Sequence, residues 1–143
     1  MGKINVKTAR KFNKKNIMTH KVITSPNAPA PIGPYSHARE LNGLVFVSGQ
    51  IPLNPATGKM VQDSIIAETE QVMQNLKAIL TEAGLSFNEI IKTTIFITSM
   101  STFQEVNKVY AGYFDGMFPA RETVQVAALP AGARVEISCI AGR

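Results

Sequence analysis

The succession of strand-like and helix-like segments limits the folds open to this chain. Six segments alternate polar and apolar residues or are dense in β-branched ones, and two longer segments repeat apolar residues at helical spacing. The expected strands are 20–24, 36–41, 44–48, 87–97, 121–126 and 134–138, and the expected helices are 64–83 and 101–115. Strand–helix–strand units join parallel strands by right-handed crossovers, whereas a hairpin joins antiparallel ones. The sheet should therefore be mixed.

Two helices can cover only one face of a six-stranded sheet. The other face also needs a cover, because an apolar sheet face of this size is not left in water. The segments supply no third layer, so the simplest cover is another copy of the protein. We therefore predict an α+β domain, with two helices on one face of a six-stranded mixed sheet, in a closed homo-oligomer packed sheet to sheet.

Glycine and capping residues set the expected ends of several elements. Asn42-Gly43 between two apolar-rich runs predicts a tight hairpin turn. Gly49 is expected to break the second strand of this hairpin, and Gly84 to end the first helix. The second helix is expected to begin at Ser101, because Gln104 three residues later completes a capping-box pattern.

Proline dominates the segment 25–34, which contains four prolines and Gly33. Proline fixes φ and removes a backbone donor, so this segment should be a stiff, extended loop and not a helix or a central strand. Tyr35 follows the loop directly. Such rigidity suits a segment that lines a pocket.

The formal charge of +5 resides in the first 17 residues. Residues 1–17 contain six basic residues and no acid, which leaves nine of the 15 basic residues and all ten acids, a net charge of −1, in 18–143. The body therefore lacks the charge of a nucleic-acid-binding domain. We predict a basic extension at 1–17 and a single domain at 18–143. The extension is an appendage without function, a mitochondrial presequence or a polyanion-binding arm, and Met18 is an alternative start.

The apolar runs, the cysteine count and the histidine count argue against a membrane span, a disulfide and a metal site. No apolar run approaches the ~20 residues that a membrane span needs, so we expect no membrane association. The single cysteine, Cys139, excludes an internal disulfide, fits a reducing compartment and should be a small buried hydrophobe. Two histidines, His20 and His37, are too few for a metal site. We expect a cytoplasmic protein, or a mitochondrial one if residues 1–17 act as a presequence.

Arg121 and Glu136 are charged residues on expected strands, and their chemistry suggests a site. A guanidinium binds a carboxylate bidentately and so fixes the orientation of an acid. A carboxylate placed beside an electrophilic carbon can take the proton of an attacking water, which typically contributes ~10²–10⁴-fold. Their spacing alone favours the alternative that both are surface charges.

Five blocks of the sequence resemble the RidA (YjgF) family of reactive-intermediate deaminases: IGPYSHA, SGQIPLNPATG, KTTIFIT, FPAR and ARVEI. The blocks occur in order, and the resemblance as a whole runs from about residue 24 to residue 141. The resemblance implies a chorismate-mutase-like α+β fold and a homotrimer with three sites in the clefts between subunits. It also implies hydrolysis, without a cofactor, of 2-imino or 2-enamino acids such as 2-iminobutanoate and 2-iminopropanoate to 2-keto acids and ammonia.

The resemblance assigns roles to individual residues. The arginine that binds the substrate carboxylate falls on Arg121, and the glutamate that directs water falls on Glu136. Further substrate-binding positions fall on Tyr35, Gly49, Asn107 and Thr123, and no metal ligand is implied. Thr123 stands where many members have a cysteine, and Ser138 stands where a second acid is often found. These departures bear on which substrate side chains fit.

The spacing of the two charged residues restricts the site. If residues 129–133 formed a tight hairpin turn, Glu136 would lie opposite Val126, and Arg121 would lie roughly 16 Å farther along at ~3.3 Å per residue. One small ligand could not touch both. Either the two strands are not sheet neighbours, or the two groups come from different subunits.

Three functions are compatible with the sequence. The first is an imine deaminase acting on a small imino acid to give a keto acid. The second is an endoribonuclease or translation inhibitor, as several family members are described. The third is a non-catalytic, chaperone-like binder of small molecules. The neutral body and the lack of an aromatic–basic face argue against nucleic acid as a partner.

Overall fold

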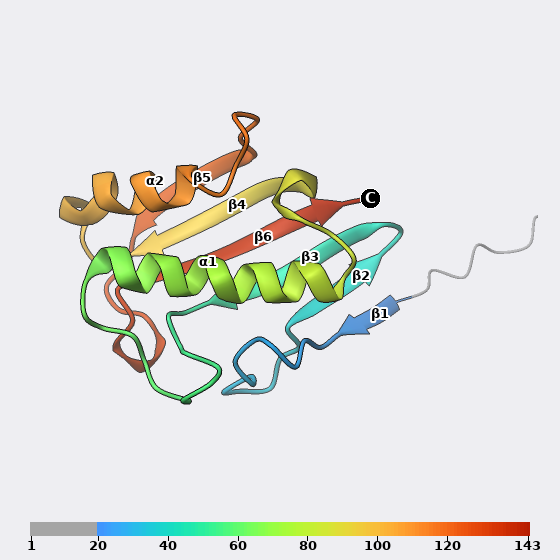
Figure 1. Cartoon of the computed structure of the whole chain (residues 1–143), viewed down its shortest axis with the longest axis horizontal. Coiled ribbons are helices and arrows are strands. Elements are labelled where there is room, and N and C mark those ends of the chain that lie inside the picture. The colour runs from blue at the N-terminus through green and yellow to red at the C-terminus, as the bar shows by residue number, and fades with distance from the viewer. Residues whose placement is uncertain (1–19) are drawn as a thin grey trace, which may run out of the picture.

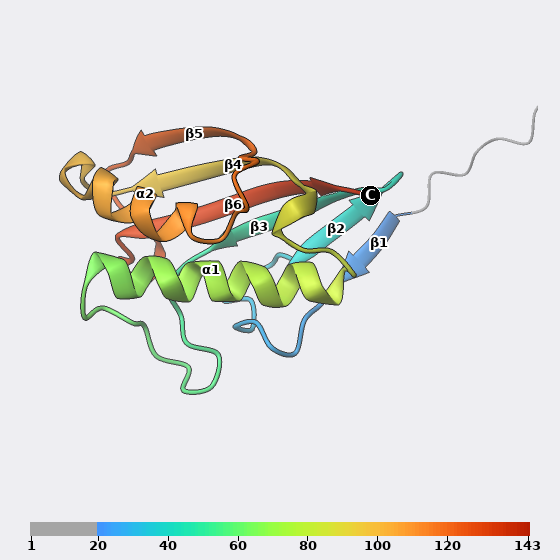
Figure 2. The ribbon, with the colours of Figure 1, turned by 45° about the horizontal axis from the view of Figure 1, so that its top comes forward.

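The computed structural model describes residues 20–143, so the predicted extension at 1–17 lies outside the described residues. The sheet consists of β1 (His20–Ile23), β2 (Ala38–Leu41), β3 (Leu44–Gln50), β4 (Ile90–Ile97), β5 (Ala120–Gln125) and β6 (Val135–Gly142). The helices are α1 (Ile65–Glu82) and α2 (Phe103–Ala111). Both lie on the same face of the sheet (Figures 1 and 2). The predicted α+β architecture is confirmed.

The sheet is mixed, with the strand order β1-β2-β3-β6-β4-β5. The pair β4–β5 is parallel, and the other neighbouring pairs are antiparallel. The chain passes from β3 through α1 to β4 and leaves a gap that the last strand, β6, fills. Strand β4 therefore separates β5 from β6. This confirms the first of the two alternatives from the sequence, that these two strands are not sheet neighbours.

Helix α1 forms where its pattern predicts it. Ser64 caps its first turn, with Oγ accepting from Ala67 N, and Gly84 follows its last turn at a φ of +71°. Its apolar stripe is buried against the sheet. The stripe also contains buried polar residues, of which Asn75 donates from Nδ2 to the carbonyls of Ile51 and Leu53. These bonds hold the loop after β3 against the helix.

Helix α2 differs from its prediction at both ends. A 3₁₀ turn at Met100–Thr102, capped by the Ser99 side chain, precedes it, so it begins at Phe103 and not at Ser101. Ser101 Oγ pairs with Ser99 Oγ at 2.7 Å instead of capping a helix, so the capping-box assignment was wrong. The helix ends at Ala111, because the chain then turns to pack its next aromatic residues on the core.

Those aromatic residues, Tyr113 and Phe114, lie beyond the helix but still join its apolar face. Tyr113 donates from its hydroxyl to Glu70 Oε2 on α1 at 2.6 Å, and Phe114 packs edge-on to Phe87. Periodicity alone placed them in the helix. The tertiary contacts instead favour a loop that ends in the buried ring of Phe114.

Gly49 does not break β3, which continues to Gln50, so that prediction was wrong. The pairing of β3 with β6 shifts register between Val47 and Gln50, and Gln50 pairs again with Ile137. A bulge thus absorbs Gly49 within the strand.

Strands near the carboxyl end also differ in length from their predictions. A true capping box, Ser86 with Glu89, opens a 3₁₀ turn, so β4 begins only at Ile90. Strand β5 begins at Ala120, one residue earlier than expected, since its polar first half pairs with β4. Strand β6 extends to Gly142.

The core lies between the helices and the sheet and contains Cys139, which is buried as predicted. The opposite face, called here the open face, carries exposed apolar side chains. They include Val22 at 54% and Phe46 at 45% exposure. The structure describes one chain, so the oligomer stays a prediction. Within residues 20–143, no helix has the length and apolar character to cross a membrane.

Candidate active site

Glu136 projects from β6 onto the open face, because its neighbours Val135 and Ile137 fill the core. Its side chain lies over Gly49 of the adjacent strand β3. A Cβ at position 49 would overlap Glu136 Oε1 and lie 2.8 Å from Cδ. Glycine at this position is therefore what makes room for the carboxylate.

Glu136 lines a hollow of about 200 Å³, called here the Glu136 hollow. Its other lining residues are Ile32, Tyr35, Ser48, Gly49, Ile51 and Pro130. Burial among these mostly apolar walls raises the pKa of the Glu136 carboxyl. A carboxyl with a raised pKa accepts a proton more readily than an ordinary glutamate, which suits a general base.

Tyr35 directly follows the proline-rich segment 25–34, which contains neither helix nor strand, as predicted; the irregular segment is longer than expected and runs from residue 24 to residue 37. The Tyr35 hydroxyl accepts from Ile32 N at 3.2 Å, and the Tyr35 backbone N–H donates to Gly33 O at 2.9 Å. These bonds fold the loop back on itself at the rim of the Glu136 hollow. The ring is 44% exposed, so it is accessible to a ligand.

Arg121 projects from β5 onto the helix-covered face of the sheet. Its Nη1 donates to Asn107 Oδ1 on α2 at 2.8 Å. Its guanidinium carbon lies 5.8 Å from the ring centre of Phe103 and 5.1 Å from that of Tyr110. These cation–π contacts orient the guanidinium. Within residues 20–143, no carboxylate forms an ion pair with Arg121.

The Tyr110 ring is itself held in place. Its hydroxyl pairs with Thr93 Oγ1 on β4 at 2.7 Å, and burial raises its pKa, although the Thr93 bond and the Arg121 charge act in the opposite direction. Tyr110 and Arg121 line a second hollow of about 430 Å³, called here the Arg121 hollow. Its lining residues are Asn107, Tyr110, Ala111, Phe118, Pro119 and Arg121.

Thr123 lies two residues after Arg121 on the same face of β5, opposite Ile95 of β4. It does not line the Arg121 hollow. Its Oγ1 is buried and has no hydrogen-bond partner within the described part of the chain. A buried hydroxyl of this kind is a candidate donor or acceptor for a bound molecule.

The two hollows are separate in one chain. Arg121 lies opposite Thr93 and Glu136 opposite Phe96, on either side of β4. Two strand spacings and a three-residue offset place their Cα atoms roughly 14 Å apart, and the side chains project from opposite faces of the sheet. One small ligand cannot contact both side chains of a single chain. The six predicted site residues thus form two groups. Glu136, Tyr35 and Gly49 lie at the Glu136 hollow, whereas Arg121, Asn107 and Thr123 lie on the helix-covered face.

Sequence reasoning missed two parts of this arrangement. The helical spacing of Phe103 and Tyr110 predicts only that they face the core, whereas both also contact the Arg121 guanidinium. The spacing of both residues by three or four from Asn107 on a helix was the signal that placed all three on one face. Within residues 20–143, no three His, Cys, Asp or Glu side chains gather as metal ligands do.

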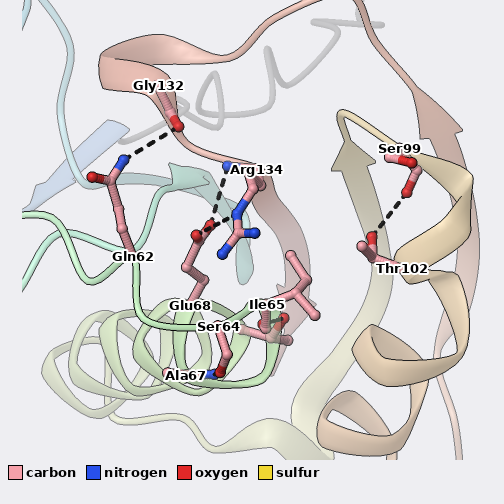
Figure 3. A network of polar contacts seen from close by, with 10 residues as sticks. Gln62, Ser64, Ile65, Ala67, Glu68, Ser99, Thr102, Gly132 and Arg134 are labelled. Carbon is pink, nitrogen blue, oxygen red and sulfur yellow. Dashed lines mark hydrogen bonds and ion pairs between the residues drawn. The ribbon is translucent and has the colours of Figure 1, made fainter.

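An ion pair also missed by sequence reasoning holds the segment leading into β6. Arg134 donates from N and Nε to the two carboxylate oxygens of Glu68 on α1, at 3.1 and 2.7 Å, and Gln62 reaches Gly132 O (Figure 3). The Glu68 side chain is fully buried. These contacts hold the turn that brings Pro130 to the Glu136 hollow.

Comparison with known proteins assigns the family. A family model described as endoribonuclease L-PSP matches residues 25–142. A solved Rid-family protein of unknown function, YyfA from Yersinia pestis, aligns with a TM-score of 0.85 and 52% identity, over 87% of this chain and 100% of that one. This chain belongs to the RidA (YjgF) family. The resemblance drawn from the five sequence blocks is confirmed.

Relatives of this RidA-family chain carry different names. It is 46% identical to the 2-iminobutanoate/2-iminopropanoate deaminase of Mus musculus over 121 residues, which cover 85% of this chain and 90% of the mouse protein. It is 52% identical to protein DfrA of Myxococcus xanthus over 126 residues, which cover 87% and 96% of the two chains. Membership of the family therefore does not by itself fix one activity.

Proposed function

We propose that this RidA-family protein hydrolyses 2-imino and 2-enamino acids, of the 2-iminobutanoate and 2-iminopropanoate type, to 2-keto acids and ammonia. The observation that carries the proposal is that the Arg121 hollow and the Glu136 hollow each supply one half of a site, called here half-sites. One presents a guanidinium without a carboxylate partner in the described chain, and the other presents a carboxylate whose pKa is raised. The name of the mouse relative supports the choice of substrate.

Arg121 binds the substrate carboxylate in this mechanism. Asn107 uses Nη1 of the guanidinium, and the Phe103 and Tyr110 rings fix its plane, so the remaining N–H groups can grip a carboxylate. A held carboxylate fixes where the adjacent imine carbon lies.

Glu136 activates water in the same mechanism. The substrate reacts as its protonated imine: Glu136 takes one proton from the water as the water oxygen bonds to the imine carbon, which gives a neutral carbinolamine. Glu136 then returns that proton to the amino nitrogen, and the C–N bond breaks to release ammonia as the hydroxyl group loses its proton to the Glu136 carboxylate and the carbonyl forms; that proton passes on to solvent or to the released ammonia. Burial raises the pKa of the Glu136 carboxyl above that of an ordinary glutamate, which suits a group that acts first as base and then as acid. Tyr35, Thr123 and the Gly49 backbone complete the substrate contacts.

The proposal places the site between copies of the chain. Because Arg121 and Glu136 project from opposite faces of one sheet, a ligand that contacts both needs the Arg121 hollow of one copy and the Glu136 hollow of another. A homotrimer packed through its open faces is the assembly that we propose. It also covers the apolar residues of that face, such as Phe46.

The test follows keto-acid release from an imine that an amino-acid oxidase generates in situ. The wild-type protein should accelerate release, and Arg121→Ala should abolish the acceleration because the carboxylate anchor is lost. Lys108→Ala is the matched control, since it removes an exposed cation from α2 beside Asn107 without entering the Arg121 hollow. Keto-acid binding without acceleration by the wild type would instead favour a non-catalytic binder.

A further inference from the structure

His37 connects the loop that carries Tyr35 to the sheet. It lies just before β2 and is 2% exposed. Its Nδ1 accepts from Ser25 N at 3.0 Å, and its Nε2 bonds to Pro29 O at 2.8 Å. One imidazole ring thus bonds to the backbone at two points of a segment in which proline leaves few donors.

These two bonds determine the state of the ring. A backbone N–H only donates, so Nδ1 must be unprotonated, and a carbonyl only accepts, so Nε2 must carry the proton. His37 is therefore a neutral imidazole in the Nε2–H tautomer. The side chain acts as an acceptor at one end of the loop and as a donor in its middle.

The backbone of His37 extends the same connection to the Glu136 hollow. Its carbonyl accepts from Ser48 N at 2.9 Å, and Ser48 Oγ donates to Ser36 O at 2.7 Å. Ser48 and Tyr35 both line the Glu136 hollow. His37 thus lies at the point where the loop wall and the strand wall of this hollow meet.

We propose that His37 is a positioning residue for the Glu136 hollow. Its ring holds the 25–36 loop so that Ile32 and Tyr35 form one wall of the space above the Glu136 carboxylate. The kinetic part of this inference rests on the proposed deaminase function, whereas the structural part does not.

The inference predicts a specific kinetic effect. The Arg121 hollow contains no residue of the loop, so the carboxylate anchor stays intact when the loop shifts. Loss of the His37 contacts should therefore lower kcat by roughly tenfold or more and raise KM by a smaller factor, because the Arg121 anchor is retained while Tyr35 and the groups around the Glu136 carboxylate are misplaced. Arg121→Ala should instead affect substrate binding.

Three variants test the inference. His37→Gln keeps one acceptor and one donor at similar spacing and should retain most of the activity. His37→Leu keeps the bulk but leaves Ser25 N–H and Pro29 C=O unpaired. His20→Leu changes the exposed histidine at the start of β1 and should behave as wild type.

Two further measurements do not depend on turnover. Nitrogen NMR of the wild-type imidazole should show the Nε2–H tautomer for His37. Amide hydrogen exchange in residues 25–36, measured against that of β6, should accelerate roughly tenfold or more in His37→Leu but not in His37→Gln. The reason is that His37→Leu leaves two buried backbone groups unpaired, which destabilises the closed loop and increases its local opening.

The outcomes separate this inference from the proposed function. Wild-type exchange and kinetics in His37→Leu, or an Nδ1–H tautomer, would overturn the positioning role. A uniform loss of stability with equal effects in His37→Gln would also overturn it. A wild-type protein without turnover would remove the deaminase but leave the tautomer and loop measurements as the decisive ones.

Discussion

Glycine at position 49 and the carboxylate of Glu136 form one unit. The strand parity of β6 directs Glu136 to the open face, and the missing side chain of Gly49 lets it lie flat on β3. The same burial that this packing produces raises the pKa of the carboxyl. The absence of a side chain at position 49 of β3 thus raises the pKa of Glu136 in the neighbouring strand β6.

The raised pKa of Glu136 predicts the pH dependence of turnover. Glu136 must be ionised to act as base, so activity should rise with pH through a midpoint above the ~4.3 of an ordinary glutamate. The carboxyl binds its proton more tightly when folded, so its contribution to stability is greatest at low pH and falls as pH rises from the unfolded pKa through the folded one. Steady-state rates from pH 4 to 9 on the wild type give the midpoint.

Glu136→Gln is the control for this prediction. It cannot titrate, so its residual rate should lack the acid limb. A wild-type midpoint at or below that of an ordinary glutamate would contradict a desolvated base.

At the scale of elements, the contact between α1 and the start of β6 depends on the ion pair of Glu68 with Arg134. The two partners differ in burial: the Glu68 side chain is fully buried, whereas that of Arg134 is 45% exposed (Figure 3). Water can therefore solvate the guanidinium when its partner is removed, but not the carboxylate. The cost of breaking the pair should depend on which side is changed.

Arg134→Ala should lower the free energy of unfolding by about 3–5 kcal/mol, because it leaves a buried carboxylate without a cation. Glu68→Gln should cost only about 1 kcal/mol, because the amide oxygen still accepts from Arg134 N. Urea denaturation at fixed protein concentration measures both. The partly exposed pair of Arg143 with Glu40 offers a matched control, and Glu40→Gln should cost about 0–1 kcal/mol. Equal costs for the two Glu68–Arg134 variants would contradict this account.

At the scale of the whole molecule, the separation of the two half-sites predicts complementation between inactive variants. Arg121→Ala and Glu136→Ala should each be inactive alone. In mixed oligomers of the two, a site between copies is intact wherever a chain with Arg121 meets a chain with Glu136, which is about one quarter of the sites in a 1:1 cyclic assembly. Co-expression with two affinity tags, followed by the imine assay, measures the recovery.

A mixture that stays inactive would contradict a shared site, provided that tandem purification shows both variants in one assembly. Glu136→Ala mixed with Glu136→Ala carrying the second tag is the control, since no arrangement of these chains restores a carboxylate.

Local signals were sufficient to predict the order of the elements, the Asn42-Gly43 hairpin and the ends of α1. These features depend on residues close in sequence, such as Ser64 at the cap and Gly84 at the stop. The family blocks likewise pointed to the residues of the candidate site. Each of these inferences needs no knowledge of which strands pair.

Long-range pairing decided the rest. The last strand inserts between β3 and β4, and nothing local to β6 specifies that position. Strand β5 has an apolar residue, Val124, on the open face, while Arg121 and Thr123 face the helices, so the usual assignment of apolar residues to the core is inverted there. The separation of Arg121 from Glu136 onto opposite faces follows from that inversion, because side-chain parity has meaning only once the neighbouring strands and helices are in place.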